Sequence, residues 1–259
     1  MAKEEIPQFN LHGRTAVVTG AGSGMGRASA IALAGHGANV AVLDVNEAGA
    51  AETVAQIGDK AMAYRCDVSN LAEVEDVMAR VRDDLGPVVI AHNNAAINLG
   101  YGQGDQRADD LSIEAWRKTL AVNLDGVFHV TRLALKDMLA EGRGSIINSA
   151  SVAGPFIGSQ NTAYTAAKGG VVGFTRALVI SYSGTGIRAN AICPGFFLTP
   201  MADNMLKNPM DVERYTSQIP VGRHGEPEDI GGLVVFLASD ASGYVNGAVI
   251  SIDGGMSLR

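Results

Sequence analysis

Tyr164 and Lys168 are a pair of residues in this sequence that could move a proton. They lie four positions apart within residues 162–182, where the apolar spacing predicts a helix, so their side chains share one helix face. A free tyrosine has a pKa of about 10, too high for efficient proton transfer at neutral pH, and a nearby ammonium lowers it. The pair therefore predicts acid–base chemistry, although by itself the same spacing also occurs in helices that do no chemistry.

A glycine-rich segment at residues 19–26, TGAGSGMG, could bind phosphate. Its pattern is T-G-x-x-x-G-x-G, and it does not match G-x-G-x-x-G in any frame. Gly20 permits a tight turn after a strand, Gly24 lets the backbone approach a pyrophosphate, and Gly26 permits close packing of helix on sheet. The pyrophosphate would lie on the unpaired N–H groups of the following helix. The segment therefore predicts a dinucleotide site.

Asp44 ends the second predicted strand and bears on the choice of dinucleotide. A carboxylate there accepts hydrogen bonds from the adenine ribose hydroxyls and repels a 2′-phosphate, which favours NAD over NADP. Neither Val45, which follows it, nor Ser23, inside the glycine-rich turn, offers a positive charge to a 2′-phosphate. The alternative is that Asp44 only caps a helix over residues 47–57, although Asn46 is the better-placed cap.

The elements that must position these residues are short apolar strands alternating with helices. This alternation predicts an α/β fold with a doubly wound (Rossmann-like) parallel sheet of about seven strands and helices on both faces. The chain shows neither a linker nor an internal repeat, which predicts a single domain over residues 1–259. We expect strands at 16–18, 39–43, 61–65, 88–92, 145–148, 187–192 and 248–252, and helices at 25–36, 47–57, 70–84, 112–140, 162–182 and 227–238.

Residues 196–215 form an irregular segment between a strand and the last helix, rich in Met, Phe and Asn. Long excursions at this edge of a sheet tend to cover substrates, so we predict a substrate lid there. An ordinary pair of surface helices is the alternative.

The composition excludes several classes of protein. A net charge of −7 argues against a nucleic-acid surface, which needs a basic stripe. The five histidines and two cysteines show no metal-ligand spacing, so we expect no metal, and a zinc-dependent alcohol dehydrogenase has no ligand set here. Cys66 and Cys193 are typical of buried residues in a reducing compartment. No signal peptide or apolar run of about 18–20 residues is present, so we expect a cytoplasmic protein without membrane contact.

From about residue 11 to the C-terminus, the sequence resembles the short-chain dehydrogenase/reductase superfamily. The resemblance implies a hydride-transferring oxidoreductase, for which Asp44 favours NAD(H) as the cofactor. It also implies a homotetramer that assembles through residues 112–140, 162–182 and the C-terminal strand. The motifs that carry it are TGAGSGMG (19–26), CDV (66–68), NNAA (93–96), VNL (122–124), SAS (149–151), Y-x-x-x-K (164–168), PG with Thr199 (194–199), RHGEPEDI (223–230) and DGG (253–255).

The resemblance also implies four catalytic residues. Tyr164 would be the general acid/base, and Lys168 would tune it and hold the nicotinamide ribose. Ser151 would hydrogen-bond the substrate oxygen; Ser149 is the rival, but the family spacing to Tyr164 selects Ser151. Asn123 would kink its helix and anchor a water that relays the proton to solvent.

The cofactor contacts are implied in the same way. Asp67 and Val68 would border the adenine, Asn94 and Ala95 the adenine ribose, and Ile192, Pro194 and Thr199 the nicotinamide. The cofactor-binding set is Gly20, Ser23, Gly24, Met25, Gly26, Asp44, Val45, Asp67, Val68, Asn94, Ala95, Tyr164, Lys168, Pro194, Gly195 and Thr199.

The substrate pocket is expected to be mainly apolar, which favours an apolar or cyclic secondary alcohol or ketone. One alternative is a 3-oxoacyl-(acyl carrier protein) reductase; that group uses NADPH, and its carrier-binding arginines would fall at His129 and Ile180. Another is a non-catalytic NAD(H)-binding sensor or scaffold, which would usually lack the Tyr or the Lys. The expected walls are Ser151, Ala153, Phe156, Asn161, Phe196, Phe197, Met201 and Met205.

Overall fold

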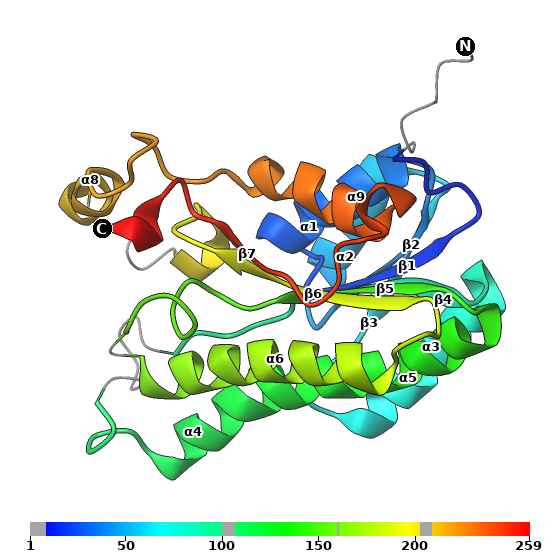
Figure 1. Ribbon diagram of the computed structural model, residues 1–259, viewed down its shortest axis with the longest axis horizontal. Coiled ribbons are helices and arrows are strands. Elements are labelled where there is room, and N and C mark those ends of the chain that lie inside the picture. The colour runs from blue at the N-terminus through cyan, green and yellow to red at the C-terminus, as the bar shows by residue number, and fades with distance from the viewer. Residues whose placement is uncertain (1–8, 100–106, 160, 203–208) are drawn as a thin grey trace.

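Short strands alternate with helices along the chain (Figure 1). We analysed a computed structural model, which describes residues 9–99, 107–159, 161–202 and 209–259. Its strands form one parallel sheet in the order β3-β2-β1-β4-β5-β6-β7. Their bounds are β1 Thr15–Thr19, β2 Asn39–Asp44, β3 Ala61–Arg65, β4 Val88–Asn93, β5 Gly144–Ser149, β6 Ile187–Pro194 and β7 Val249–Ile252. The doubly wound parallel sheet predicted from the sequence is confirmed.

Helices cover both faces of the sheet, which explains why most of its strands are continuously apolar (Figure 1). One face packs against α1 (Gly24–Gly35), α2 (Glu47–Ile57) and α9 (Gly231–Ala238), and apolar side chains from these helices form a core with Val18, Ile90 and Ile147. The other face is covered by α3 (Leu71–Leu85), α5 (Gly126–Glu141) and α6 (Thr162–Ser181), and α4 (Ile113–Leu120) packs beside α6.

Polar caps set where several helices begin. The side chain of Asn46 accepts a hydrogen bond from the Gly49 amide at the start of α2, and Asn70 caps α3 in the same way. Such caps satisfy amides that have no partner inside the helix. Helix α5 ends at Gly142, whose φ of +63° is a left-handed conformation that glycine adopts without strain.

Two predicted helices are interrupted. The segment predicted as one helix over 112–140 consists of α4, a π-helical turn η1 (Ala121–Asp125) and α5. The segment predicted over 227–238 begins with a 3₁₀ turn, Pro227–Ile230, because Pro227 opens it and Glu226 and Asp229 form a reciprocal capping box there. The spacing of apolar residues does not distinguish a 3₁₀ turn or a π-helical turn from an α-helix.

The segment predicted to form a lid contains a 3₁₀ turn, Pro200–Ala202, and helix α8 (Pro209–Thr216). Residues 203–208 of it lie outside the described residues, and its role as a lid stays a prediction. None of the helices in the described ranges is long and apolar enough to cross a bilayer.

Candidate active site

A cavity of about 930 Å³ lies at the carboxyl edge of the sheet. Parallel α/β sheets bind ligands at this edge, where loops from several strands converge. Most residues assigned from the sequence line this cavity: Gly20, Ser23, Gly24, Met25, Asp44, Val45, Asp67, Val68, Asn94, Ala95, Ser151, Ala153, Asn161, Tyr164, Lys168, Pro194, Gly195, Phe196, Phe197, Thr199 and Met201. The structure therefore brings the candidate catalytic and cofactor-binding residues into one continuous space.

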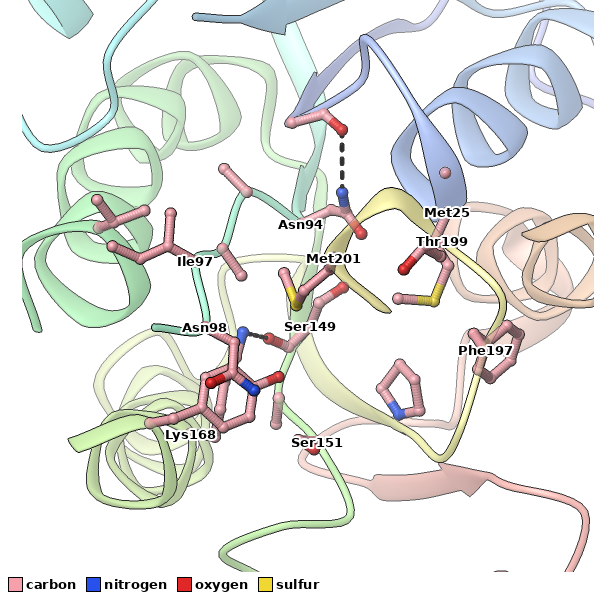
Figure 2. A pocket seen from close by; sticks show the side chains of 18 of the residues that line it. Met25, Asn94, Ile97, Asn98, Ser149, Ser151, Lys168, Phe197, Thr199 and Met201 are labelled. Atoms are coloured by element: carbon pink, nitrogen blue, oxygen red, sulfur yellow. Dashed lines mark hydrogen bonds between the residues drawn. The ribbon is translucent and has the colours of Figure 1, made fainter. Parts of the chain in front are cut away.

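Lys168 lies almost completely buried on α6, beside Tyr164 in this cavity. Its Nζ donates a 2.6 Å hydrogen bond to the main-chain carbonyl of Ser149 (Figure 2). The same Nζ lies 5.6 Å from the centre of the Tyr164 ring. Burial lowers the pKa of Lys168 to about 8, partly offset by the nearby Cys193. The ammonium is therefore held in place near Tyr164, as the four-residue spacing predicts.

The two candidate serines have different hydrogen-bond partners. The Oγ of Ser149 lies 3.0 Å from Nε2 of the buried His92. The Oγ of Ser151 accepts a hydrogen bond from the Ala153 amide at 3.2 Å, which leaves its hydroxyl proton available for donation into the cavity. This difference favours Ser151 as the residue that donates to a substrate oxygen.

Asn123 lies in the π-helical turn and is fully buried, behind the cavity wall. Its Oδ1 accepts a hydrogen bond from the Ile97 amide and its Nδ2 donates one to the Ile97 carbonyl, both at 2.8 Å. The side chain therefore anchors residues 97–99, which line the cavity after β4. A role in holding a water stays a prediction.

The glycine-rich turn is packed so closely that Gly20 and Gly26 leave no room for a side chain against the neighbouring backbone. A Cβ on Gly20 would lie 2.8 Å from the Cα of Ala95, and Gly20 has a φ of +62°. A Cβ on Gly26 would collide with the carbonyl oxygen of Gly20. Gly26 thus packs the first turn of α1 on the glycine-rich turn itself, and it lies behind the cavity wall.

The start of α1 fits an anionic group. Its N-cap residue, Ser23, makes no side-chain cap, and the first turn contains no acidic residue. The amides of that turn thus have no side-chain cap, and Gly24 and Met25 line the cavity. Amides at a helix N-terminus bind phosphate, so the residues present fit the pyrophosphate of a dinucleotide.

Asp44 is oriented by two amides at the far end of the cavity. One carboxylate oxygen accepts a 2.8 Å hydrogen bond from the Gly22 amide, and the other accepts a 2.9 Å hydrogen bond from the Asn46 amide. The cap of α2 is the side chain of Asn46, so Asp44 does not serve as that cap. The nearby cation Arg27 is engaged with the Gly22 carbonyl and with Glu52.

Several assigned residues do not line the cavity. Phe156 is one of them, and the prediction that it forms a pocket wall is wrong, because the turn closed by the Ile157 amide and the Val152 carbonyl exposes 44% of the Phe156 residue. Ile157, its neighbour, lines the cavity instead. Ile192 belongs to the buried core, and Met205 lies outside the described residues.

Further residues line the cavity besides those selected above as catalytic, cofactor-binding or wall residues. Some of these residues are next to assigned motifs in the sequence, and this adjacency could have identified them. Lys118 carried no such signal, whereas Met256 directly follows the DGG motif. The added residues include Cys66, Ala96, Ile97, Asn98, Leu99, Lys118, Val122, Ser149, Ala150, Val152, Ile157, Gly158, Ser159, Pro200 and Met256. Within the ranges that the structure describes, no cluster of three or more His, Cys, Asp or Glu could hold a metal ion.

A cradle for a dinucleotide and a Tyr–Lys pair in one cavity define a class of protein, the oxidoreductases that use a nicotinamide dinucleotide. Residues 20–257 match the family model described as Enoyl-(Acyl carrier protein) reductase. The chain belongs to the short-chain dehydrogenase/reductase family.

Similar proteins cover nearly the whole chain. D-beta-hydroxybutyrate dehydrogenase of Cupriavidus necator is 40% identical, over 95% of this chain and 98% of that protein. Cyclohexanol dehydrogenase of an Acinetobacter species is 38% identical, over 99% and 100%. The crystal structure of a gluconate 5-dehydrogenase from Burkholderia cenocepacia, in complex with NADP and tartrate, is 32% identical with a TM-score of 0.90, over 98% and 99%.

Proposed function

We propose that this chain is an NAD(H)-dependent enzyme that interconverts a secondary alcohol and a ketone. The observation that carries the proposal is the shared cavity, with Tyr164, Lys168 and Ser151 at one end and Asp44 at the other. Two similar proteins, whose names describe them as dehydrogenases of D-beta-hydroxybutyrate and of cyclohexanol, support a substrate that carries a hydroxyl group.

In the direction of oxidation, the phenolate of Tyr164 takes the proton of the substrate hydroxyl. The Ser151 hydroxyl donates a hydrogen bond to the substrate oxygen and orients it. The Lys168 ammonium favours the phenolate and steadies the charge that develops on that oxygen. When bound, the nicotinamide supplies the acceptor for the hydride that leaves the carbinol carbon. The protein thus contributes orientation, proton transfer and electrostatics.

We propose NAD(H) as the cofactor because of the charges at the adenine end of the cavity. Asp44 presents a carboxylate that Gly22 and Asn46 already orient, and Val45 beside it is an exposed apolar residue. Arg27, which could neutralise a 2′-phosphate, is held in an ion pair with Glu52. The NADP bound to the Burkholderia gluconate 5-dehydrogenase makes a direct comparison of both cofactors necessary.

We propose an apolar or cyclic substrate because side chains such as Ile97, Leu99, Ile157, Phe196 and Met201 line the cavity. An acyl-carrier-protein substrate is the second candidate, and the description of the matching family model favours it. Against it, neither of the positions expected to hold carrier-binding arginines carries one. One is His129, whose Nδ1 lies 2.9 Å from the Val68 carbonyl, and the other is Ile180, which is 79% exposed.

We also propose a homotetramer in the cytoplasm. Phe128 on α5 and Ile180 on α6 expose apolar side chains, as do Tyr244 and Leu258 near β7, which supports two separate contact surfaces. The two cysteines are unpaired and buried, which supports a reducing compartment. Light scattering on the purified protein tests the assembly, because the tetramer has four times the mass of one chain.

Reduction of NAD⁺ tests the proposed activity, with NADP⁺ in parallel, across aliphatic, benzylic, cyclic and polyol secondary alcohols. We expect turnover with NAD⁺ on an aliphatic or cyclic alcohol, and the reverse reaction on the matching ketone with NADH. A 3-oxoacyl thioester with NADPH tests the second candidate in the same assay. Tight NADH binding without turnover of any of these compounds would instead indicate a non-catalytic binding protein.

A further inference from the structure

His92 is a polar residue inside the apolar core, on strand β4. Its neighbours across the sheet are Val18 on β1 and Ile147 on β5, and His92 itself is fully buried. A buried polar side chain costs free energy unless it forms hydrogen bonds, and an apolar residue would avoid that cost. The presence of an imidazole at this position therefore calls for an explanation.

Two hydrogen bonds connect His92 to the candidate catalytic lysine. The Nε2 of His92 lies 3.0 Å from the Oγ of Ser149, which ends β5. The main-chain carbonyl of the same Ser149 accepts the 2.6 Å hydrogen bond from Lys168 (Figure 2). All three residues are at most 4% exposed, so bulk water does not compete for these contacts. Ser149 thus joins the imidazole on β4 to the ammonium on α6.

The surroundings of His92 determine its charge and favour one of its tautomers. Burial lowers the pKa of His92 to about 3, so the imidazole is neutral at working pH. Its Nδ1 has no hydrogen-bond partner among the described residues. A bare nitrogen there is less costly than a buried N–H without an acceptor. The proton therefore lies on Nε2, which donates to the Ser149 hydroxyl.

We propose that His92 is a positioning residue for Lys168, acting by fixing the Ser149 residue whose carbonyl holds the ammonium. The inference rests on the proposed function, in which Lys168 tunes Tyr164. The titratable groups that face Lys168 are Tyr164 on its own helix and Cys193 on β6, a thiol whose pKa burial raises to about 11. His92 does not titrate between neutral and alkaline pH, so a changed pH profile in a His92 variant reports a change at Lys168 or Tyr164.

Three substitutions at His92 separate positioning from packing. In His92→Gln the side-chain amide nitrogen reaches about as far as Nε2, whereas in His92→Asn it reaches only the place of Nδ1. His92→Val removes the donor and introduces a β-branched apolar residue that suits a strand. We expect His92→Val and His92→Asn to lower kcat about tenfold, the cost of a small displacement at a reacting group, with KM for the alcohol unchanged. The midpoint of the pH profile of kcat should shift in His92→Val and in His92→Asn. His92→Gln should restore both kcat and this midpoint.

NADH binding gives a readout that needs no turnover. Because Lys168 is expected to hold the nicotinamide ribose, we expect the Kd of NADH to rise about threefold in His92→Val, for the loss of part of one hydrogen bond, and to recover in His92→Gln. If the wild-type protein turned over no alcohol, the proposed function would fail while this measurement would still test the inference. An unchanged Kd in His92→Val, together with an unchanged pH midpoint, would show that His92 only fills the core.

Ser149→Ala completes a double-mutant cycle, and it removes the acceptor for His92 while keeping the carbonyl that binds Lys168. If His92 acts through Ser149, adding His92→Val to Ser149→Ala should cause no further loss of kcat. Additive losses would overturn the proposal. If His92→Val does not fold, the pH profile of Ser149→Ala tests the proposal by itself. The proposal requires Ser149→Ala to shift the midpoint of that profile as His92→Asn does, and an unshifted midpoint would overturn it.

Discussion

The Asp44 carboxylate accepts a 2.8 Å hydrogen bond from the Gly22 amide, which joins the end of β2 to the glycine-rich turn after β1. A Cβ on Gly22 would lie 2.9 Å from this carboxyl group, so only glycine allows the approach. The contact orients a negative charge at the end of the cavity where we propose that the adenine ribose binds. In that proposal the carboxylate is already oriented before any cofactor binds, so discrimination between cofactors is a property of the folded protein.

Asp44→Asn should reduce the preference for NAD⁺ over NADP⁺ at least about tenfold, because the side chain keeps its shape and loses the charge that repels a 2′-phosphate. The ratio of kcat/KM for the two cofactors measures this effect. Glu47→Gln is the matched control, since it removes a negative charge three residues further along, in the first turn of α2. Equal changes of the ratio in both variants would contradict a specific role for Asp44.

Tyr164→Phe should lower kcat about 10²–10⁴-fold, the usual contribution of a positioned acid–base group, while NADH still binds. Steady-state assays and NADH fluorescence titration measure the two quantities separately. Tyr182→Phe, at the C-cap of the same helix, serves as the control and should keep full activity. Normal turnover by Tyr164→Phe would remove this residue from the mechanism.

Asn123→Ala should destabilise the protein by about 2–4 kcal/mol, because it leaves the Ile97 amide and carbonyl without their partner inside the structure. Turnover should fall as well, since residues 97–99 line the cavity. Urea unfolding measures the first effect. Asn39→Ala makes a suitable comparison, because Asn39 at the start of β2 forms a backbone hydrogen bond to Arg14 and no side-chain hydrogen bond of it is seen within the described residues. Similar stabilities of the two variants would argue against the anchoring role.

Ile157→Ala should raise KM for an apolar alcohol about tenfold, because it removes apolar surface from the cavity wall. Phe156→Ala removes a larger side chain from the adjacent position and should leave KM unchanged, since Phe156 does not line the cavity. Measuring KM for the same alcohol with both variants tests which of the two side chains contacts the substrate. A larger effect of Phe156→Ala would mean that the turn is oriented differently when substrate is bound.

Lys168 should make the stability of the cofactor-free protein depend on alkaline pH. Burial lowers the pKa of Lys168 from 10.5 to about 8, so between these values the unfolded chain binds a proton that the folded chain lacks. Raising the pH through this window therefore favours the folded state, by up to about 3 kcal/mol at about 1.4 kcal/mol per pKa unit. Lys168→Met lacks this titration, so the wild type should gain stability relative to the variant. If the free energies of unfolding of the wild type and of Lys168→Met changed equally over this pH range, the result would contradict a buried ammonium.

Much of the fold was predictable from the sequence, because it depends on short-range patterns. Continuous apolar strands between amphipathic helices indicated a parallel sheet, and the sheet order confirms it. Residues near strand ends, such as Asp44, Gly20 and Gly24, line the cavity at the edge where the sequence predicts a dinucleotide site. Chain periodicity and turn chemistry determine which side chains can reach that edge.

Other parts of the site were decided only by the tertiary structure. The orientation of one turn selected Ile157 over Phe156 as a wall, and the π-helical turn directed Asn123 toward Ile97. His92 and Ser149 lie 57 residues apart in the chain and meet because β4 pairs with β5 in a particular register. Sequence patterns act within a few residues and specify which elements form. Contacts between distant elements depend on their packing, so they became visible only once the sheet was assembled.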